Sequence, residues 1–149
     1  MPRIMAIDYG LSRIGIALTD PLQIISSGFV TLTNDSDSYK NIIDIIKTKD
    51  VETLVIGIPF DQESKIGDSA RKVLVFAERL LSEMEKIQLK ISVYEQDERY
   101  STRTAHESMS LTKIKNKNRK KVVDQIAAAN ILKEFMESNK KTLLDIKRY

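Results

Sequence analysis

Acidic side chains at three separate points of the sequence could together carry out metal-dependent chemistry. Asp8 ends a short apolar run, Asp97 and Glu98 follow the last predicted strand, and Asp124 lies in an alanine-rich segment. The carboxyl ends of strands are where α/β folds place their functional groups. Three converging carboxylates would form an all-oxygen site, which suits Mg²⁺ or Mn²⁺ and does not suit zinc. Paired cations of this kind stabilise both the attacking and the leaving oxygen of a phosphodiester displacement.

Each acid also has a simpler interpretation. Asp8 could be a turn residue that accepts hydrogen bonds from its own backbone. Asp97 and Glu98 are adjacent on an extended chain, so only one of them can face a given site. Asp124 could be stabilised by the dipole near a helix N-terminus without binding anything. Local sequence leaves these alternatives open.

Composition restricts the chemistry to few residue types. The chain has 149 residues, no Cys and one His, His106, which excludes thiolate nucleophiles, disulfides and Cys-based or multi-histidine metal sites. Its net charge of +3 is too small to establish a polyanionic partner. The sequence shows neither a signal-peptide pattern nor a segment long enough to cross a bilayer, so we expect a cytoplasmic protein with no membrane partner.

Basic residues are concentrated between positions 113 and 121. This run contains six Lys or Arg residues and no acid: Lys113, Lys115, Lys117, Arg119, Lys120 and Lys121. Such a run is typical of a solvated loop, but beside a carboxylate site it could also contact a phosphate backbone of any sequence. Ser101 or Thr102 would cap a helix whose free N–H groups favour phosphate. With Arg13 and Arg99, these residues are the predicted contacts to a nucleic-acid substrate.

The elements that must position these side chains follow from the hydrophobic periodicity. Apolar runs predict strands over 4–7, 13–19, 27–33, 53–58 and 90–95, and helical periodicity predicts helices over 38–49, 66–87, 101–109 and 121–139. Short links favour antiparallel pairing of the first three strands, whereas strands that follow crossover helices should be parallel to the first. We therefore predict an α/β fold with a mixed five-stranded sheet and helices on both faces, as one domain over 1–139 with a C-terminal tail over 140–149.

Four blocks of the sequence occur in the order typical of one known family. They are Asp8-x-Gly10-x-x-Arg13-Ile14-Gly15-x-Ala17-x-x-Asp20, then Gly57-Ile58-Pro59, then Asp97-Glu98-Arg99-x-Ser101-Thr102 with Ala105, and finally Asp124-x-x-Ala127-Ala128-x-x-Ile131-Leu132. With these blocks the chain resembles the YqgF family, RNase H-like domains described as Holliday junction resolvases or pre-16S rRNA nucleases. The resemblance extends over residues 1–137, nearly the whole chain.

The resemblance implies an RNase H-like fold with sheet order 3-2-1-4-5. It also implies a cytoplasmic nuclease that acts in maturation of the 5′ end of 16S rRNA during ribosome biogenesis. The metal-binding catalytic residues would be Asp8, Glu98 and Asp124, with Mg²⁺ or Mn²⁺ as the cofactor. Two positions depart from the family pattern: Thr19 stands where Ser is usual, and residues 60–65 replace a Gly-containing loop, so we expect that loop to differ in shape.

Several functions remain compatible with the sequence. A metal-dependent nuclease acting on an RNA precursor is the leading hypothesis, and branched DNA is the alternative substrate because a fold does not fix a function. The protein could be a monomer or a homodimer, and a homodimer would favour the junction because two symmetric strands must be cut. A non-catalytic RNA- or ribosome-binding module would keep the acids for structure. A sugar-kinase-like phosphotransferase shares the strand-end Asp-x-Gly, but the chain lacks a second lobe.

Overall fold

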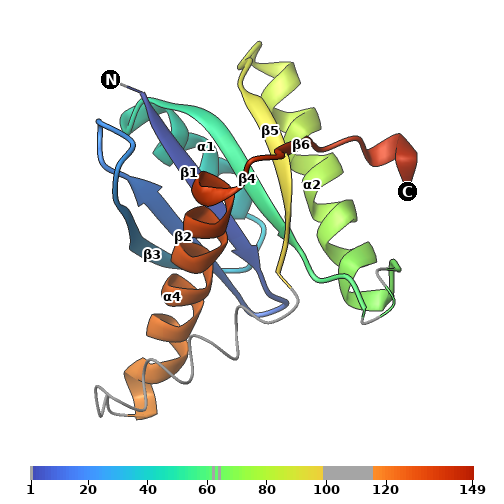
Figure 1. Ribbon diagram of the computed structural model, residues 1–149, viewed down its shortest axis with the longest axis horizontal. Coiled ribbons are helices and arrows are strands. Elements are labelled where there is room, and N and C mark those ends of the chain that lie inside the picture. The colour runs from blue at the N-terminus through green and yellow to red at the C-terminus, as the bar shows by residue number, and fades with distance from the viewer. Residues whose placement is uncertain (1, 62, 64, 99–115) are drawn as a thin grey trace.

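A mixed β-sheet runs through the centre of the molecule in the computed structural model, which describes residues 2–61, 63, 65–98 and 116–149 (Figure 1). The sheet order is β3-β2-β1-β4-β5-β6. The strands are β1 Arg3–Tyr9, β2 Arg13–Thr19, β3 Ser26–Thr33, β4 Val51–Ile58, β5 Ser92–Asp97 and β6 Thr142–Leu143. As predicted, β1, β2 and β3 pair antiparallel, whereas β4 is parallel to both β1 and β5.

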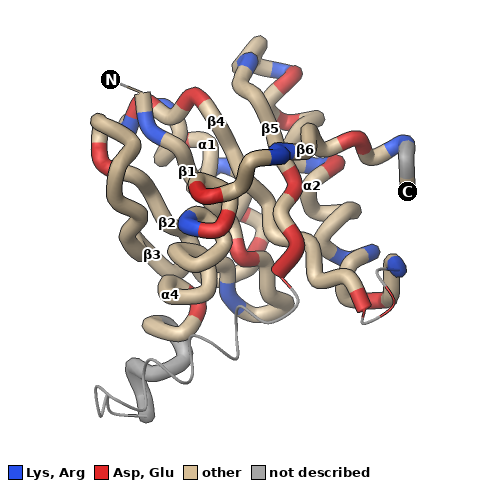
Figure 2. The backbone as a smooth tube through the Cα atoms, in the orientation of Figure 1, with Lys and Arg blue, Asp and Glu red and all other residues tan. Residues whose placement is uncertain are grey.

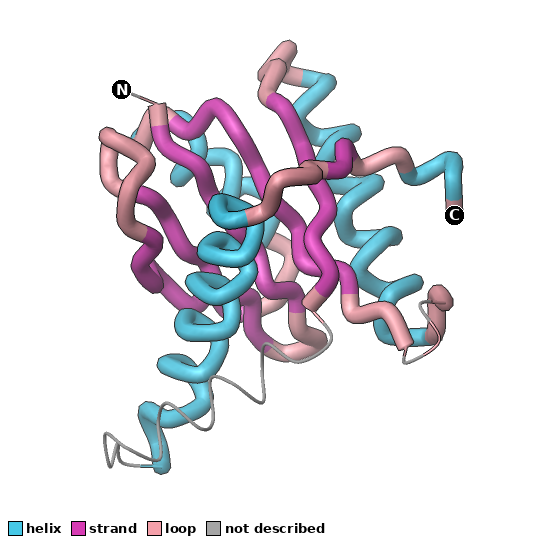
Figure 3. The backbone as a smooth tube through the Cα atoms, viewed as in Figure 1, coloured by secondary structure: helices cyan, strands magenta, loops and turns pink. Residues whose placement is uncertain are grey.

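Helices cover both faces of this sheet, which also agrees with the prediction. They are α1 Ser38–Thr48, α2 Asp68–Lys86 and α4 Asn116–Glu137, and a 3₁₀ turn follows at Ile146–Arg148. Helices α1 and α2 lie on one face, and α4 crosses the other over β1, β2 and β3 (Figures 1 and 3). The helix predicted over 101–109 lies outside the described residues. None of the helices in the described part of the chain combines the length and the hydrophobicity needed to span a bilayer.

The alternation of side chains along β1 decides which face carries Asp8. Met5 and Ile7 are fully buried among residues of α1 and α2, whereas Ala6 is buried against α4. Because successive side chains of a strand point to opposite faces, Asp8 lies on the same face as Ala6. The acid that ends β1 is therefore directed toward α4.

Small residues allow α4 to pack very closely on the sheet. A Cβ atom built on Gly15 of β2 would lie 2.1 Å from the backbone oxygen of Asp124, and one on Gly28 of β3 would lie 2.7 Å from the Cβ of Gln125. Both distances are far below van der Waals contact. The missing side chains thus let α4 rest on the backbone of β2, with Asp124 directly above that strand.

The sheet has six strands instead of the predicted five. The extra strand, β6, pairs antiparallel with β5 and comes from within residues 140–149. The backbone N–H of Leu144 then donates to the carbonyl of Val93, at 3.0 Å, and the Tyr149 hydroxyl donates to the Glu95 carboxylate. A strand of two residues is too short to show the alternation by which strands are recognised in a sequence.

Helix α4 begins earlier than the sequence analysis placed it. It starts at Asn116 rather than near residue 121, so four of the basic positions lie in its first turns and not in a loop: Lys117, Arg119, Lys120 and Lys121. Lys and Arg are good helix formers, and this run contains neither Gly nor Pro. Helix propensity, rather than the charge of the run, decides its conformation.

Candidate functional site

The C-terminal ends of the parallel strands bring the predicted acids to one edge of the sheet. Asp8 is near the end of β1, and Glu98 directly follows β5. Strand β4 lies between these two strands and pairs in parallel with each of them. Figure 2 shows the acidic end of β5 at this edge, near the end of β1. This is the edge at which open α/β sheets bind their ligands.

The position of Glu98 depends on the neighbouring strand β4. Its backbone N–H donates to the carbonyl of Ile58 at 3.2 Å, which continues the β4–β5 pairing one residue beyond β5. Its side chain is buried and occupies space next to Gly57, where a Cβ atom would lie 2.8 Å from Oε2 of Glu98. Glu98, rather than Asp97, therefore turns its carboxyl group toward Asp8. The negative charge of Asp97 adds to the raised pKa of Glu98, and it also raises the pKa of Glu134 of α4, after the larger effect of burial.

The carboxyl groups of Asp8 and Glu98 are joined by a hydrogen bond. Two carboxyl groups can form such a bond only when one of them is protonated. Burial raises the pKa of Asp8 from 3.8 to about 6; the bond to Glu98 opposes this increase and the negative charge of Asp124 adds to it. Burial and the charge of Asp8 raise the pKa of Glu98 well above its ordinary value. A cation bound between the two carboxyl groups would therefore stabilise their ionised forms.

Asp124 is the third acid at this edge, and it has a basic partner. Its Oδ2 accepts a hydrogen bond from Nε of Arg13 at 2.8 Å. Its backbone lies over Gly15, which is the cross-strand partner of Asp8. The three predicted acids therefore converge, although they come from two strand ends and a helix. Arg13, a predicted substrate contact, pairs with one of them.

The donor set fits a divalent cation at the Asp8–Glu98 pair. Adjacent carboxylate oxygens are the ligands that Mg²⁺ and Mn²⁺ prefer. Within the described ranges, no three His, Cys, Asp or Glu side chains are already grouped closely enough to hold one metal ion. The carboxylate of Asp124 is directed to Arg13, whose Nε bonds to its Oδ2. Asp124 would act as a further ligand if its carboxylate turned from Arg13 toward the cation.

The other predicted contacts are only partly described. Residues Arg99, Ser101, Thr102, Lys113 and Lys115 lie outside the described residues. Lys117, Arg119, Lys120 and Lys121 lie in the first turns of α4, the same end of the helix that carries Asp124. The role of Gly57 was not predicted from the sequence. The signal was present in Gly57-Ile58-Pro59, but local sequence shows only that a strand ends there.

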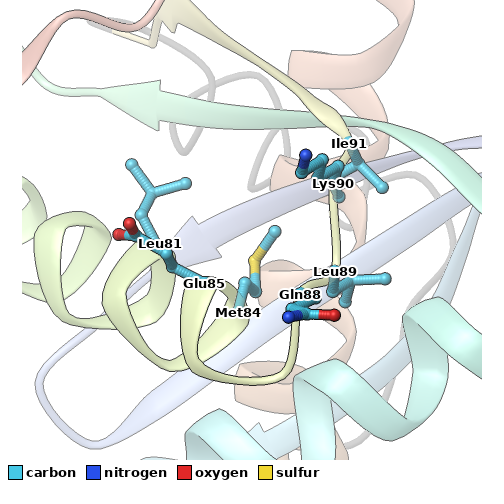
Figure 4. Close-up of a pocket in the computed structure, with 7 residues that line it drawn as sticks. All are labelled: Leu81, Met84, Glu85, Gln88, Leu89, Lys90 and Ile91. Carbon is cyan, nitrogen blue, oxygen red and sulfur yellow. The ribbon is translucent and has the colours of Figure 1, made fainter.

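A separate hollow of about 780 Å³ lies at the opposite edge of the sheet, between the end of α2 and the start of β5 (Figure 4). It is lined by Leu81, Met84, Glu85, Gln88, Leu89, Lys90 and Ile91. None of these residues belongs to the predicted site, and the single acid and single base do not form a group suited to metal chemistry. The strand-end acids are therefore the candidate functional site.

Comparison with known proteins assigns this chain to a family. A family model described as "RuvX: Holliday junction resolvase" matches residues 2–138. The chain belongs to the RuvX family. RuvX is also called YqgF, so the resemblance drawn from the sequence blocks is confirmed.

Curated RuvX relatives match over nearly their whole length. A "Putative pre-16S rRNA nuclease" of Acetivibrio thermocellus is 35% identical over 144 residues, which cover 95% of this chain and 99% of the relative. A protein of the same name from Clostridium acetobutylicum is 34% identical over 138 residues, covering 91% and 98% respectively. The RuvX chain is thus a member of a family of nucleases.

Solved structures confirm the fold of this RuvX chain. The structure titled "T. thermophilus RuvC in complex with Holliday junction substrate" matches with a TM-score of 0.59 and 11% identity, covering 97% of this chain and 100% of that one. The structure titled "Thermus thermophilus RuvC structure" matches with a TM-score of 0.58 and 10% identity, over 95% and 99%. At these identities the likeness shows the fold alone, which is the RNase H-like fold that was predicted.

Proposed function

We propose that this RuvX chain is a metal-dependent nuclease that hydrolyses a phosphodiester bond of a 16S rRNA precursor during maturation of its 5′ end. The observation that carries the proposal is the hydrogen-bonded Asp8–Glu98 pair at the strand-end edge, with Asp124 beside it. The names of relatives that match nearly the whole chain supply the substrate. We infer a cytoplasmic location because bacterial ribosomes are assembled there.

Asp8 and Glu98 would hold Mg²⁺ or Mn²⁺ between their carboxylates. When bound, such a cation supplies Lewis-acid activation of the phosphate and stabilises charge on the departing oxygen. Binding of the cation by these residues depends on ionisation of their carboxyl groups. Because Asp8 has a raised pKa of about 6, its carboxyl group retains a proton in mildly acidic solution and releases it at higher pH. We therefore expect activity to rise as the pH increases through about 6.

The basic positions of the chain would bind the phosphate backbone. Four of them lie in the first turns of α4, at the end of the helix that carries Asp124. Lys and Arg contacts of this kind bind polynucleotides without regard to sequence and weaken as salt increases. This arrangement would hold a strand across the sheet edge, with one phosphodiester group over the Asp8–Glu98 pair.

Branched DNA is the second candidate substrate. The description of the matching family, "Holliday junction resolvase", favours it. The same acids would act on both substrates, so the site itself does not discriminate between them. Resolution of a junction requires two symmetric cuts and hence two active sites in one assembly, so a stable homodimer in solution would favour this alternative.

A cleavage assay on both substrates tests the proposal. The wild-type chain, Asp8→Asn and a control, Asp44→Asn, would each be incubated with Mg²⁺ or Mn²⁺ and either a 16S precursor RNA or a four-way DNA junction. Asp44 is an exposed acid on α1, on the other face of the sheet, which makes it a matched control. We expect the wild-type chain to cut the RNA, Asp8→Asn to be slower by about 100-fold or more, and Asp44→Asn to be unchanged.

Other outcomes would replace the proposal with a specific alternative. If the junction alone were cut, branched DNA would be the substrate. If neither substrate were cut while wild type and Asp8→Asn bound RNA equally well, the chain would be a non-catalytic RNA-binding module. Cleavage by Asp8→Asn at the wild-type rate would show that the acids have been assigned wrongly.

A further inference from the structure

An ion pair joins Arg13 of β2 to Asp124 of α4, the third acid of the candidate site. Nε of Arg13, the first residue of β2, lies 2.8 Å from Oδ2 of Asp124. The two residues are 111 positions apart in the chain. The Asp124 side chain is 18% exposed and the Arg13 side chain 36%, so solvent and solutes can reach the arginine while the carboxylate is mostly covered.

The pair lies directly beside the Asp8–Glu98 carboxyl groups. Gly15 is the cross-strand partner of Asp8, and the backbone of Asp124 rests on Gly15. Asp124 is also close enough to Asp8 for its charge to act on it. The Arg13 guanidinium is therefore a cation that already neutralises one of the three acids of the candidate metal site.

Arg13 and a divalent cation would compete for the same carboxylate. In the described portion of the chain, the acids are not grouped as a ready site for a metal ion, and the carboxylate of Asp124 is held by Arg13. Breaking a partly buried ion pair without replacing it leaves an uncompensated charge, which is costly. Asp124 can therefore join Asp8 and Glu98 around a cation at low cost only if Arg13 gains a new anionic partner at the same time.

A phosphodiester group is the anion best suited to replace Asp124. A guanidinium has five N–H donors in a planar fork, and the hydrogen bond to Asp124 uses one of them, at Nε. Phosphate oxygens can accept two such bonds side by side, which gives a stronger and better-oriented interaction. The partial exposure of Arg13 leaves it accessible to a strand that crosses the sheet edge.

We propose that Arg13 is a positioning residue that holds Asp124 in the free protein and transfers to a phosphate of the bound polynucleotide, which leaves Asp124 to the divalent cation. This inference rests on the proposed function and adds to it the order in which polynucleotide and cation bind. The polynucleotide completes the metal site, and each ligand strengthens binding of the other. Coupling between two binding sites is reciprocal and typically amounts to about 5- to 150-fold in affinity.

The test measures metal affinity rather than activity. Mn²⁺ would be titrated into the full chain, with binding followed by electron paramagnetic resonance of the free ion, in the absence and presence of a 2′-O-methyl RNA oligonucleotide that is checked to be intact afterwards. The proteins would be wild type, Arg13→Gln, Arg13→Lys and Arg79→Gln. Arg79 is an exposed arginine on α2, on the face of the sheet away from α4, and serves as the control. Thermal unfolding of each protein would show that it is folded.

Arg13→Gln should bind Mn²⁺ with nearly the same affinity in the absence and in the presence of RNA. In wild type and Arg79→Gln, RNA should tighten Mn²⁺ binding by at least about 5-fold. Without RNA, Arg13→Gln should bind Mn²⁺ more tightly than wild type because Asp124 no longer has a competing cation, and added RNA should change that affinity by less than about 2-fold. Arg13→Lys should restore part of the coupling, since Lys keeps the charge but not the planar fork.

Two results would overturn this inference. One is full coupling in Arg13→Gln; the other is weaker Mn²⁺ binding by folded Arg13→Gln without RNA, which would mean that Arg13 supports the metal site instead of competing for it. Both leave the proposed function intact if wild type still binds Mn²⁺ and cuts RNA. A wild-type chain that binds no Mn²⁺ and cuts nothing would remove the proposed function and this inference together.

Discussion

The carboxyl group of Glu98 occupies space that any side chain on Gly57 would need. A Cβ atom on Gly57 would lie 2.8 Å from Oε2 of Glu98 and 2.6 Å from Cδ1 of Ile131. Gly57 is on β4, the strand between the two strands that end at the acids. The absence of a side chain at this position is therefore what allows a buried carboxyl group to reach Asp8.

Substitution Gly57→Ala should displace Glu98 and reduce function more than stability. We expect at least about 10-fold slower cleavage, since small displacements of catalytic groups have effects of this size. Stability should fall by about 1–3 kcal/mol, the usual cost of an extra methyl group in a packed interior. The measurements are RNA cleavage and urea unfolding. Gly67→Ala is the matched control because a Cβ atom there has nothing within 4 Å, and equal behaviour of the two variants would refute this role of Gly57.

Substitution Gly15→Ala should destabilise the protein more than Gly57→Ala. Its Cβ atom would lie 2.1 Å from the backbone oxygen of Asp124, and a helix backbone cannot move aside as a side chain can. We expect a decrease of about 3 kcal/mol or more in the free energy of unfolding, above the usual range for overpacking. Urea unfolding of both variants under the same conditions provides the comparison. A smaller decrease for Gly15→Ala would show that α4 is not fixed closely to β2.

The raised pKa of Asp8 predicts how stability changes with pH. Asp8 titrates near 3.8 in the unfolded chain and near 6 in the folded one, so the folded state binds the proton more tightly. Stability contributed by this group is present below about pH 4 and disappears as the pH rises through about 6. The decrease is about 3 kcal/mol, and Glu98, whose pKa is also raised, acts in the same direction.

Asp8→Asn should remove this dependence. In EDTA, the variant and wild type should unfold at similar urea concentrations near pH 4, whereas at pH 8 the variant should be the more stable protein. Subtracting the two curves cancels the titration of groups that do not interact with Asp8. The titration of Glu98 contributes to the difference, because the charge of Asp8 raises its pKa. If the variant were less stable than wild type at pH 8, Asp8 would instead support the fold. It would then be the turn residue, accepting hydrogen bonds from its own backbone, that the sequence offers as the simpler interpretation.

Salt dependence tests whether the basic run binds the phosphate backbone. Replacing Lys113, Lys115 and Lys117 by Gln should lower the affinity for RNA by a similar factor whatever the nucleotide sequence of the RNA. The slope of log affinity against log salt concentration should become shallower by about 0.7 for each phosphate of a single strand that the protein no longer neutralises. Fluorescence anisotropy with a labelled RNA at several salt concentrations measures this slope. An unchanged slope would exclude these lysines from the RNA-binding surface.

Features encoded by local periodicity were predictable from the sequence. Strand β2 has the predicted limits, Arg13–Thr19, because an apolar run is bounded by clear turn residues. The face on which Asp8 lies was not predictable in this way, because residues 4–7 are apolar at every position and only the packing shows that Ala6 lies against α4. Convergence of Asp8, Glu98 and Asp124 was expected mainly from the family resemblance, which carries information about tertiary structure that periodicity lacks.

Features that depend on contacts distant in sequence were not predictable from it. Arg13 and Asp124 are 111 residues apart, and each was interpreted from its own neighbours, one as a substrate contact and the other as a metal ligand. Local sequence places Gly57 in a predicted strand over 53–58, whereas its importance comes from Glu98, which follows the neighbouring strand of the sheet. In both cases the decisive information is the packing of one element on another, which no local pattern contains.

Direct titration of Mn²⁺ would show whether Asp8 and Glu98 together hold the catalytic cation, on which the proposed function depends. Binding to wild type, Asp8→Asn, Glu98→Gln and the control Asp44→Asn would be followed calorimetrically at pH 8, which is above the pKa of about 6 of Asp8. We predict that Asp44→Asn binds as wild type does, while each of the other two variants binds at least about 10-fold more weakly and remains folded. Wild-type affinity in folded Asp8→Asn and Glu98→Gln would contradict this assignment.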